Sequence, residues 1–309
     1  MKFYNNIEEL VGKTPLLKVN NIIKELNLDA NLFVKLENFN PAGSIKDRVA
    51  LEIINDAEKK GLIQKGGTII EATSGNTGIG LASIGASKGY KVIIVMPNSM
   101  SVERIKLIKS YGAEVVLTDG KLGMQGAVDK ANEIYNSTKN SFIASQFENP
   151  SNPSAHYNTT AKEIFEDTNG LVDFVVAGIG TGGTISGIGK YLKEQNDNIK
   201  IVGVEPFSSP LITKGVSGSH KIQGIGANFV PSNFNASVVD EIILAKDEDA
   251  ILFSRLLATK EGVLAGFSSG ANLFAGVELA KRKENKGKNI VIILADTGER
   301  YLSTNLFID

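Results

Sequence analysis

Short runs of β-branched and apolar residues alternate along the chain with longer segments of helical periodicity. The apolar runs span residues 68–71, 91–96, 114–118, 172–178, 200–205 and 289–295. Such nearly continuous apolar runs are typical of parallel strands buried on both faces. Gly61, Gly89 and Gly112 follow the helical stretches at positions where helices are expected to end. The pattern predicts an α/β architecture with mostly parallel sheets.

The strand and helix units form two sets, one before about residue 145 and one after about residue 170. The polar link SQFENPSNPSAH separates them. Together they exceed what one open sheet usually needs, which favours two doubly wound domains. Segment 206–235, rich in Ser, Gly, Pro and Asn, is long for a connector, so it is either a functional loop or a surface insertion.

Composition excludes several classes of partner. Lys and Arg number 33 against 34 Asp and Glu, so no charge excess attracts nucleic acid or anionic lipid. No apolar run approaches a membrane span, and Glu8 and Glu9 interrupt the only semi-apolar stretch at the N-terminus. Cys is absent, and neither His156 nor His220 has a partner at metal-site spacing. We expect a cytoplasmic protein without a metal, a nucleic-acid partner or a membrane anchor.

A glycine-rich turn follows the strand predicted at 172–178. Gly178, Gly180 and Gly183 form G-x-G-x-x-G, which by itself is a dinucleotide fingerprint. The string GIGTGGT also places Thr181 and Thr184 beside the backbone N–H groups of a helix N-terminus. That composition suits one phosphate at least as well as a pyrophosphate. A tight turn without a ligand explains the glycines alone equally well.

Gly266, Ser268 and Gly270 spell G-x-S-x-G, the nucleophile elbow of α/β-hydrolases. The hydrolase triad needs a His later in the chain, and both histidines precede Ser268, so this function is excluded. Ser268 and Ser269 are also suited to capping a helix that begins near Ala271. Capping and a ligand contact are compatible.

A second turn, TSGNTGIG at 73–80, opens another predicted helix. Its N–H groups, hydroxyls and amide are suited to holding a carboxylate at the positive helix end. As a plain loop it is unusually rich in hydroxyl groups. A carboxylate site is the favoured interpretation.

The segment NPAGSIKDR at 40–48 carries an amine in an unusual place. Asn40 and Pro41 predict a turn, Ser44 and Asp47 have capping-box spacing, and Lys46 falls in the first turn of an amphipathic helix. A solvated surface lysine is the commoner role of a single Lys. The positive helix end nevertheless promotes loss of the proton, which an amine needs in order to attack an aldehyde.

Taken together, these segments resemble the cysteine synthase (O-acetylserine sulfhydrylase) family of fold-type II pyridoxal-phosphate enzymes. The resemblance covers nearly the whole chain in family order. It rests on VGKTPLL, KLENFNPAGSIKDR, EATSGNTGIGLA, VMPNSMSVER, QFENPSNP, GIGTGGT, VGVEP, HKIQGIGA, FSSG and GERYLSTNLF. So many ordered matches are far more specific than any single glycine motif.

The resemblance implies two doubly wound, mostly parallel-sheet domains with the active site in the cleft between them. Residues 1–39 and 147–309 are then the larger domain, which binds the cofactor phosphate. Residues 40–146 are the smaller, substrate-binding domain, which is expected to move. The family also implies a homodimer and a complex with serine acetyltransferase.

The same resemblance assigns roles to individual residues. Lys46 is implied to be the Schiff-base lysine of pyridoxal 5'-phosphate, Asn76 to bond the 3'-oxygen and Ser268 to face the pyridine nitrogen. The cofactor phosphate is assigned to Gly180, Thr181, Gly182, Gly183 and Thr184. The substrate carboxylate is assigned to Thr73, Ser74, Thr77 and Gln146. The loop from Gly224 to Ala227 is expected to border the substrate entrance.

The implied reaction converts O-acetyl-L-serine and sulfide to L-cysteine and acetate through an α-aminoacrylate intermediate. A neutral serine opposite the pyridine nitrogen favours this β-replacement, because a carboxylate there would stabilise a long-lived carbanion. Lys46 is expected to remove the α-proton.

Other functions stay open at this point. AHYNTT at 155–160 resembles a sister isoform that accepts other sulfur donors, whereas HKIQGIGA and QFENP resemble the main sulfide-using form. A cystathionine-β-synthase-like use of homocysteine is a further alternative. An NAD-dependent oxidoreductase would leave Lys46, Asn76 and Ser268 without roles, and the intact Lys46 argues against a purely non-catalytic binding protein.

Overall fold

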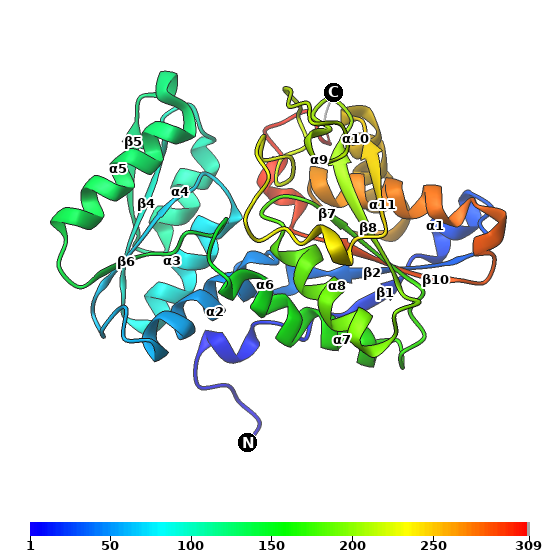
Figure 1. The fold of residues 1–309 in the computed structure, drawn as a ribbon, viewed down its shortest axis with the longest axis horizontal. Coiled ribbons are helices and arrows are strands. Elements are labelled where there is room, and N and C mark those ends of the chain that lie inside the picture. Colours follow the sequence, from blue (N-terminus) through cyan, green and yellow to red (C-terminus); the bar gives the residue numbers. More distant parts are fainter. Residues whose placement is uncertain (308–309) are drawn as a thin grey trace. The chain divides into compact units, whose positions relative to one another are not determined.

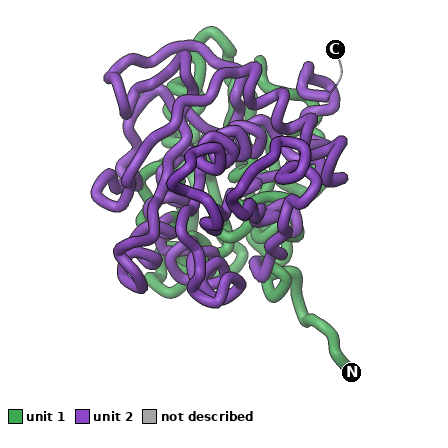
Figure 2. Tube along the Cα trace, turned by 90° about the vertical axis from the view of Figure 1, so that its right-hand side faces the viewer, with its two compact units in different colours: residues 1–11, 40–152 green, residues 12–39, 153–309 purple. Residues whose placement is uncertain are grey.

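The computed structural model describes residues 1–307, which divide into two compact units. Unit 1 comprises residues 1–11 and 40–152, and unit 2 comprises residues 12–39 and the chain from 153 onward (Figure 2). In the described part of the chain, no helix is long and apolar enough to cross a membrane.

Unit 1 is built on a four-stranded parallel sheet in the order β5-β4-β3-β6. The strands are β3 (Thr68–Ala72), β4 (Lys91–Pro97), β5 (Glu114–Thr118) and β6 (Ser141–Ile143). Ile70 pairs with Ile93 on one side and with Ile143 on the other. Because all four strands run the same way, the turns that follow them lie at one edge of the sheet.

Helices cover both faces of this sheet (Figure 1). The helices of unit 1 include α2 (Lys46–Lys59), α3 (Asn76–Lys88), α4 (Val102–Ser110) and α5 (Gly123–Ser137). Apolar side chains of α2, α3 and α4 pack with Ile69 and Ile94 on one face. Ala127 and Ala131 of α5 pack with Ile70 on the other. The apolar strands are therefore buried on both faces, as their sequences predict.

Unit 2 contains a six-stranded sheet in the order β1-β2-β10-β7-β8-β9, parallel except for β1. Its strands are β1 (Leu16–Lys18), β2 (Asn31–Leu36), β7 (Phe174–Gly178), β8 (Lys200–Pro206), β9 (Glu241–Ala245) and β10 (Asn289–Leu294). The helices are α1 (Asn20–Glu25), α7 (Ala161–Asp167), α8 (Gly183–Gln195), α9 (Leu211–Lys214), α10 (Asp247–Leu256) and α11 (Phe267–Ala280). Helix α6 (Ser151–Ala155) and a π-helix (His156–Thr160) precede α7.

The central core of unit 2 lies between the sheet and the helices α10 and α11. Leu32, Val176 and Ile292 from three neighbouring strands pack there with Leu273 and Val277 of α11. Helices α7 and α8 lie against the opposite face (Figure 1). The α/β architecture with mostly parallel sheets is confirmed.

All six predicted strands form, and four others were not predicted. Strand β6 has only three residues, and Lys35 interrupts the apolar run of β2. Strands β1 and β9 were also missed. The predicted helix ends are confirmed, since Gly61, Gly89 and Gly112 have φ of 68°, 76° and 83°, where glycine carries no Cβ penalty.

Two helix caps that the residue spacing allowed do not form. Ser44 and Asp47 form no capping box, because the Asp47 carboxylate accepts from the Ala42 N–H (2.6 Å) and the Ser44 hydroxyl accepts from the Lys46 N–H (3.2 Å). Helix α11 begins at Phe267, before the predicted start near Ala271, and no side chain caps it. Ser269 instead accepts from the N–H of Ala295 at the end of β10 (2.9 Å).

The compact units differ from the predicted domains in two segments. Residues 1–11 belong to unit 1, where Ile7 and Val11 pack against its core and Glu8 pairs with Lys88 (3.4 Å). Residues 147–152 also belong to unit 1, where the Ser151 hydroxyl donates to Asp56 (2.8 Å). Long-range contacts of this kind are invisible in sequence periodicity.

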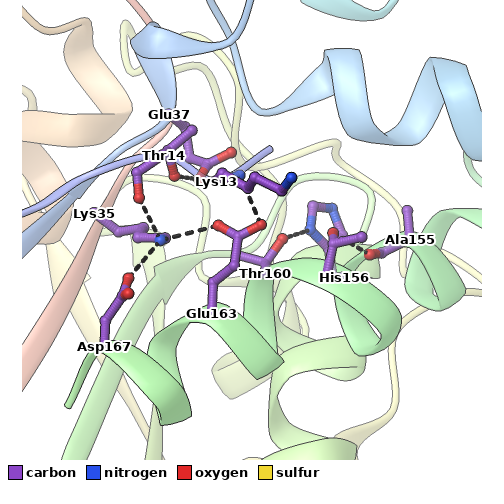
Figure 3. Close-up of polar contacts among 10 residues, drawn as sticks. Lys13, Thr14, Lys35, Glu37, Ala155, His156, Thr160, Glu163 and Asp167 are labelled. Carbon is purple, nitrogen blue, oxygen red and sulfur yellow. Dashed lines mark hydrogen bonds and ion pairs between the residues drawn. The ribbon is translucent and has the colours of Figure 1, made fainter. Parts of the chain in front are cut away.

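A buried lysine joins two distant segments of unit 2. Lys35 is fully buried, and its ammonium contacts Glu163 and Asp167 of α7 at 3.0 Å each and donates to the Thr14 carbonyl at 2.6 Å (Figure 3). The Thr14 hydroxyl donates to buried Glu37 (2.6 Å). A buried ammonium requires such partners, because desolvation disfavours its charge. The network therefore fastens the segment before β1 to α7.

We expect Lys35→Met to lower the free energy of unfolding by about 3 kcal/mol, because two acidic side chains lose their shared cation in a partly buried site. Urea unfolding of the purified protein measures the change. The matched control is Lys288→Met, since the Lys288–Asp173 pair is 47% and 29% exposed. That control should lose less than about 1 kcal/mol, and equal losses would contradict the assigned role of Lys35.

Candidate active site

Lys46 is the first residue of α2, and its side chain is half-buried between buried neighbours. A turn precedes it, in which the Gly43 N–H donates to the Asn40 carbonyl (2.8 Å) and Gly43 has φ of 78°. Asp47 is fully buried and braces this turn through the Ala42 N–H. The amine is thus held at a well-defined helix start, as the sequence predicts.

Helix α3 approaches the start of α2 very closely. A Cβ on Gly80 would lie 3.0 Å from the Lys46 carbonyl oxygen and 3.3 Å from the Ala50 Cβ. Any larger residue would displace the backbone that carries Lys46. Gly80 lies one turn after Asn76 and Thr77, so this contact brings the first turn of α3 close to Lys46.

The turn between β3 and α3 is rich in backbone and hydroxyl donors. The Thr73 N–H continues the sheet by donating to Val95 (3.0 Å), and the Thr73 hydroxyl accepts from the Gly75 N–H (3.2 Å). Arg104 of α4 donates to the Ser74 carbonyl (3.1 Å), which fixes the middle of the turn. Asn76 is the first residue of α3. These groups lie at the positive end of a 13-residue helix, a suitable place for a carboxylate.

Gln146 comes to this turn from the segment after β6. Its side-chain oxygen accepts a short hydrogen bond from the Thr77 hydroxyl, and both side chains are buried. Thr77 and Gln146 are 69 residues apart in the sequence. Unit 1 therefore contains the proposed Schiff-base lysine, the residue assigned to the cofactor 3'-oxygen and the four residues assigned to the substrate carboxylate: Lys46, Asn76, Thr73, Ser74, Thr77 and Gln146.

Glu71 lies on β3, just before the turn that leads into α3, and was not identified from the sequence. It is 3% exposed on β3, and its carboxyl oxygens accept from the N–H groups of Ser145 (2.8 Å) and Gln146 (3.3 Å). Burial raises the pKa of Glu71 from 4.5 to about 7, although these N–H groups and the Gln146 side chain oppose the rise. An acidic residue at the end of an apolar strand, two positions before a polar turn, is the signal that could have revealed it.

The glycine-rich turn of unit 2 leads from β7 into α8. A Cβ on Gly180 would lie 2.3 Å from the Gly224 carbonyl oxygen. Gly182 has φ of 78°, and a Cβ there would lie 2.7 Å from the Phe234 Cα. Only glycine fits at both positions, so the loop presents bare backbone at the N-terminus of α8, flanked by Thr181 and Thr184. This cradle fits a phosphate group.

His156 is a second residue that the sequence analysis did not assign. Its ring is fully buried, with Nδ1 3.0 Å from the Thr160 hydroxyl (Figure 3) and Nε2 3.2 Å from the Thr184 hydroxyl. With Nε2 protonated, the ring donates to Thr184 and orients the Thr184 hydrogen away from itself. Gly187 allows this packing, because a Cβ there would lie 2.2 Å from the Pro153 carbonyl oxygen.

Ser268 is in the first turn of α11 and is 5% exposed. A Cβ on Gly224 would lie 3.4 Å from its hydroxyl oxygen, so the loop predicted to border the substrate entrance passes directly beside it. Gly224 has φ of 98°, which favours glycine. Unit 2 thus brings Ser268, Gly224 and the Gly180 turn together.

No group of three or more His, Cys, Asp or Glu side chains within residues 1–307 is arranged to hold a metal ion. The donors that the two units do present are an amine, hydroxyls, amides and backbone N–H groups. This donor set suits an organic cofactor that carries an aldehyde and a phosphate.

Residues 7–296 match the family of pyridoxal-phosphate-dependent enzymes, and the chain belongs to that family. It is therefore an enzyme that uses pyridoxal phosphate. Within the family it is similar over its whole length to cysteine synthases. Cysteine synthase B of Campylobacter jejuni is 53% identical over 99% of this chain and 100% of that protein.

Solved structures agree with this similarity. A cysteine synthase of Entamoeba histolytica is 46% identical, with a TM-score of 0.96 over 99% of this chain and 91% of that one. A hydrogen sulfide-producing enzyme of Fusobacterium nucleatum is 49% identical, with a TM-score of 0.92 over 97% of this chain and 100% of that one.

We expect the wild-type protein to lose stability relative to Glu71→Gln as the pH rises from about 4.5 to about 7. Because the pKa of Glu71 is higher in the folded protein than in the unfolded chain, the folded state binds more protons in this range. The full change is about 3 kcal/mol, and it levels off above pH 7. Urea unfolding of both proteins across this range measures it, and a pH-independent difference would contradict the raised pKa.

Proposed function

We propose that this chain is a cysteine synthase, which converts O-acetyl-L-serine and sulfide to L-cysteine and acetate with pyridoxal 5'-phosphate. The observation that carries the proposal is the grouping, within unit 1, of Lys46 with the donor-rich first turn of α3. The names and full-length similarity of the relatives support the choice of substrates.

In this proposal, Lys46 binds the cofactor covalently, Asn76 bonds its 3'-oxygen and Ser268 faces its pyridine nitrogen. The loop Gly180, Thr181, Gly182, Gly183 and Thr184 holds the phosphate. The Gly180 and Gly182 cradle and the Thr184 hydroxyl, which lies 3.2 Å from His156 Nε2, support the phosphate assignment. When bound, the cofactor supplies an electron sink for cleavage at the α- and β-carbons.

The substrate carboxylate is assigned to Thr73, Ser74, Thr77 and Gln146. The positive end of α3 and the hydroxyl-rich turn support this assignment. Once the substrate amine has displaced Lys46 from the cofactor, the freed Lys46 Nζ would accept the α-proton as the bond between the β-carbon and the acetate oxygen breaks and acetate leaves. Hydrosulfide would then form the new bond to the β-carbon while Lys46 Nζ returns the proton to the α-carbon. Ser268 offers a neutral hydroxyl, which favours β-replacement. Unit 1 is accordingly the substrate-binding part, and its mobility stays a prediction.

Use of another sulfur donor, as in the sister isoform or a cystathionine-β-synthase-like enzyme, is the alternative. The cysteine synthase relatives favour sulfide. The hydrogen sulfide-producing relative indicates that similar chains also serve related sulfur chemistry.

We further propose that the protein acts in the cytoplasm as a homodimer and binds serine acetyltransferase. The resemblance to the cysteine synthase family carries this proposal, and the exposed residues Phe3 (68%) and Tyr4 (53%) offer apolar surface for a contact. Sedimentation velocity of the purified protein, alone and mixed with serine acetyltransferase, tests both associations. A monomer that sediments unchanged in the mixture would contradict them.

We expect purified protein to absorb visible light and to change its spectrum on addition of O-acetylserine without sulfide. An unchanged spectrum would contradict the proposal.

Lys46→Ala should lower cysteine formation by about 10²–10⁴-fold or more, because it removes both the covalent anchor and the base. The matched control is Lys59→Ala, at the exposed other end of α2, which should keep wild-type turnover.

The sulfur donor is identified in the same assay. Wild-type protein should turn over O-acetylserine faster with sulfide than with homocysteine. Faster turnover with homocysteine would favour the alternative.

A further inference from the structure

Glu71 is a buried acid that has no assigned role in the proposed reaction. It is 3% exposed, and among the described residues no cation forms an ion pair with it. Burial of an unpaired acidic group is unfavourable, as its raised pKa indicates. An apolar residue at this strand position would avoid the free-energy cost of burying an acid. The presence of a carboxyl group here therefore needs another explanation.

The contacts of Glu71 lie where the β3–β6 ladder ends. Ile70 pairs with Ile143, and the Ala144 N–H donates to the Ile70 carbonyl (3.0 Å). The next two N–H groups, of Ser145 and Gln146, have no strand partner and donate to the Glu71 side chain instead. Glu71 thereby continues the ladder through its side chain.

The segment that Glu71 holds has an unfavourable backbone. Ser145 has φ of 51°, in the left-handed region that a residue with a Cβ adopts at a cost of about 1 kcal/mol or more. Two hydrogen bonds to one carboxyl group offset this cost. Gln146 follows directly, and its position depends on this turn.

Gln146 transmits the constraint to α3. Its side-chain oxygen accepts from the Thr77 hydroxyl in the first turn of that helix, and its carbonyl accepts from Asn152 (2.8 Å). Glu71 therefore reaches the donor-rich turn through Gln146: its carboxyl group holds the 145–146 backbone and also accepts from the Gln146 side chain, whose oxygen in turn accepts from Thr77.

We infer that Glu71 is a positioning residue for the substrate carboxylate, acting through Gln146 and Thr77. The inference rests on the proposed function, in which Gln146 and Thr77 bind that carboxylate. Glu71 does not touch the substrate. Its loss should weaken binding of amino-acid carboxylates while Lys46, held by Gly80 and Asp47, keeps its place.

Glu71→Gln tests the inference, because it preserves the shape of the side chain but turns one acceptor into a donor that faces an N–H group. We expect the KM for O-acetylserine to rise about tenfold. This corresponds to the loss of one hydrogen bond between the turn and the charged substrate carboxylate. We expect kcat, cofactor content and the visible spectrum of the ligand-free holoenzyme to change little. A merely structural role would lower kcat, cofactor content and thermal stability together.

A matched control is Glu58→Gln, the same change at a carboxylate of unit 1 that bonds Tyr90 and Lys88 away from the turn. It should leave the KM unchanged. A folded Glu71→Gln protein with a wild-type KM would overturn the inference.

A double-mutant cycle then identifies the route. If Glu71 acts through Gln146, Glu71→Gln should have no further effect on the KM in a Gln146→Ala background. Fully additive effects would overturn the inference.

A binding measurement keeps the inference separable from the proposed function. L-alanine has the carboxylate but no leaving group, so titrating the visible spectrum of the holoenzyme with L-alanine reports carboxylate binding without turnover. We expect about tenfold weaker binding in Glu71→Gln, and equal binding would overturn the inference. Absence of cysteine formation by the wild type, with L-alanine binding intact, would contradict the proposed function alone.

Discussion

The contact between Gly80 and the backbone of Lys46 is the packing constraint on which the chemistry of unit 1 depends. It sets α3 directly against the first turn of α2, so that the amine and the donor-rich turn belong to one rigid arrangement. Val49 and Ala50 of α2 and Ile79 of α3 are fully buried in the core of unit 1. A reactive side chain held by helix packing in this way is positioned more precisely than one carried by a loop.

Both units use the same physical device for anions. In each, a parallel strand ends in a turn rich in glycine and hydroxyl groups, and a helix begins directly after the turn, so that the first N–H groups of the helix lie at the turn. Strand β3 and α3 provide this arrangement in unit 1, and β7 and α8 provide it in unit 2. The glycines are needed for different contacts. Gly180 and Gly182 let neighbouring loop backbone approach closely, whereas Gly80 lets the helix that carries Lys46 approach closely.

Three buried polar residues hold the backbone segments around them in place. Glu71 completes the ladder before Gln146, His156 bonds the Thr184 hydroxyl, and Lys35 fastens the chain before β1 to α7. Each is nearly inaccessible to solvent and each is satisfied by partners far away in the sequence. Desolvation makes an unsatisfied group at these positions costly, so their partners are held firmly in place.

The order of residues along the chain was sufficient to predict six strands, the helix ends at Gly61, Gly89 and Gly112, the place of Lys46 in a first helical turn and the family. These features depend on local periodicity, on backbone conformations that only glycine adopts easily, and on ordered motifs.

Tertiary structure decided the rest. Strand β2 is buried although Lys35 interrupts its pattern, because α7 supplies the counter-charges. Asp47 turns to Ala42 and Ser269 turns to β10, so neither predicted cap forms. The parts played by Glu71 and His156 depend on hydrogen bonds to residues 74 and 28 positions away, and such contacts have no local signature.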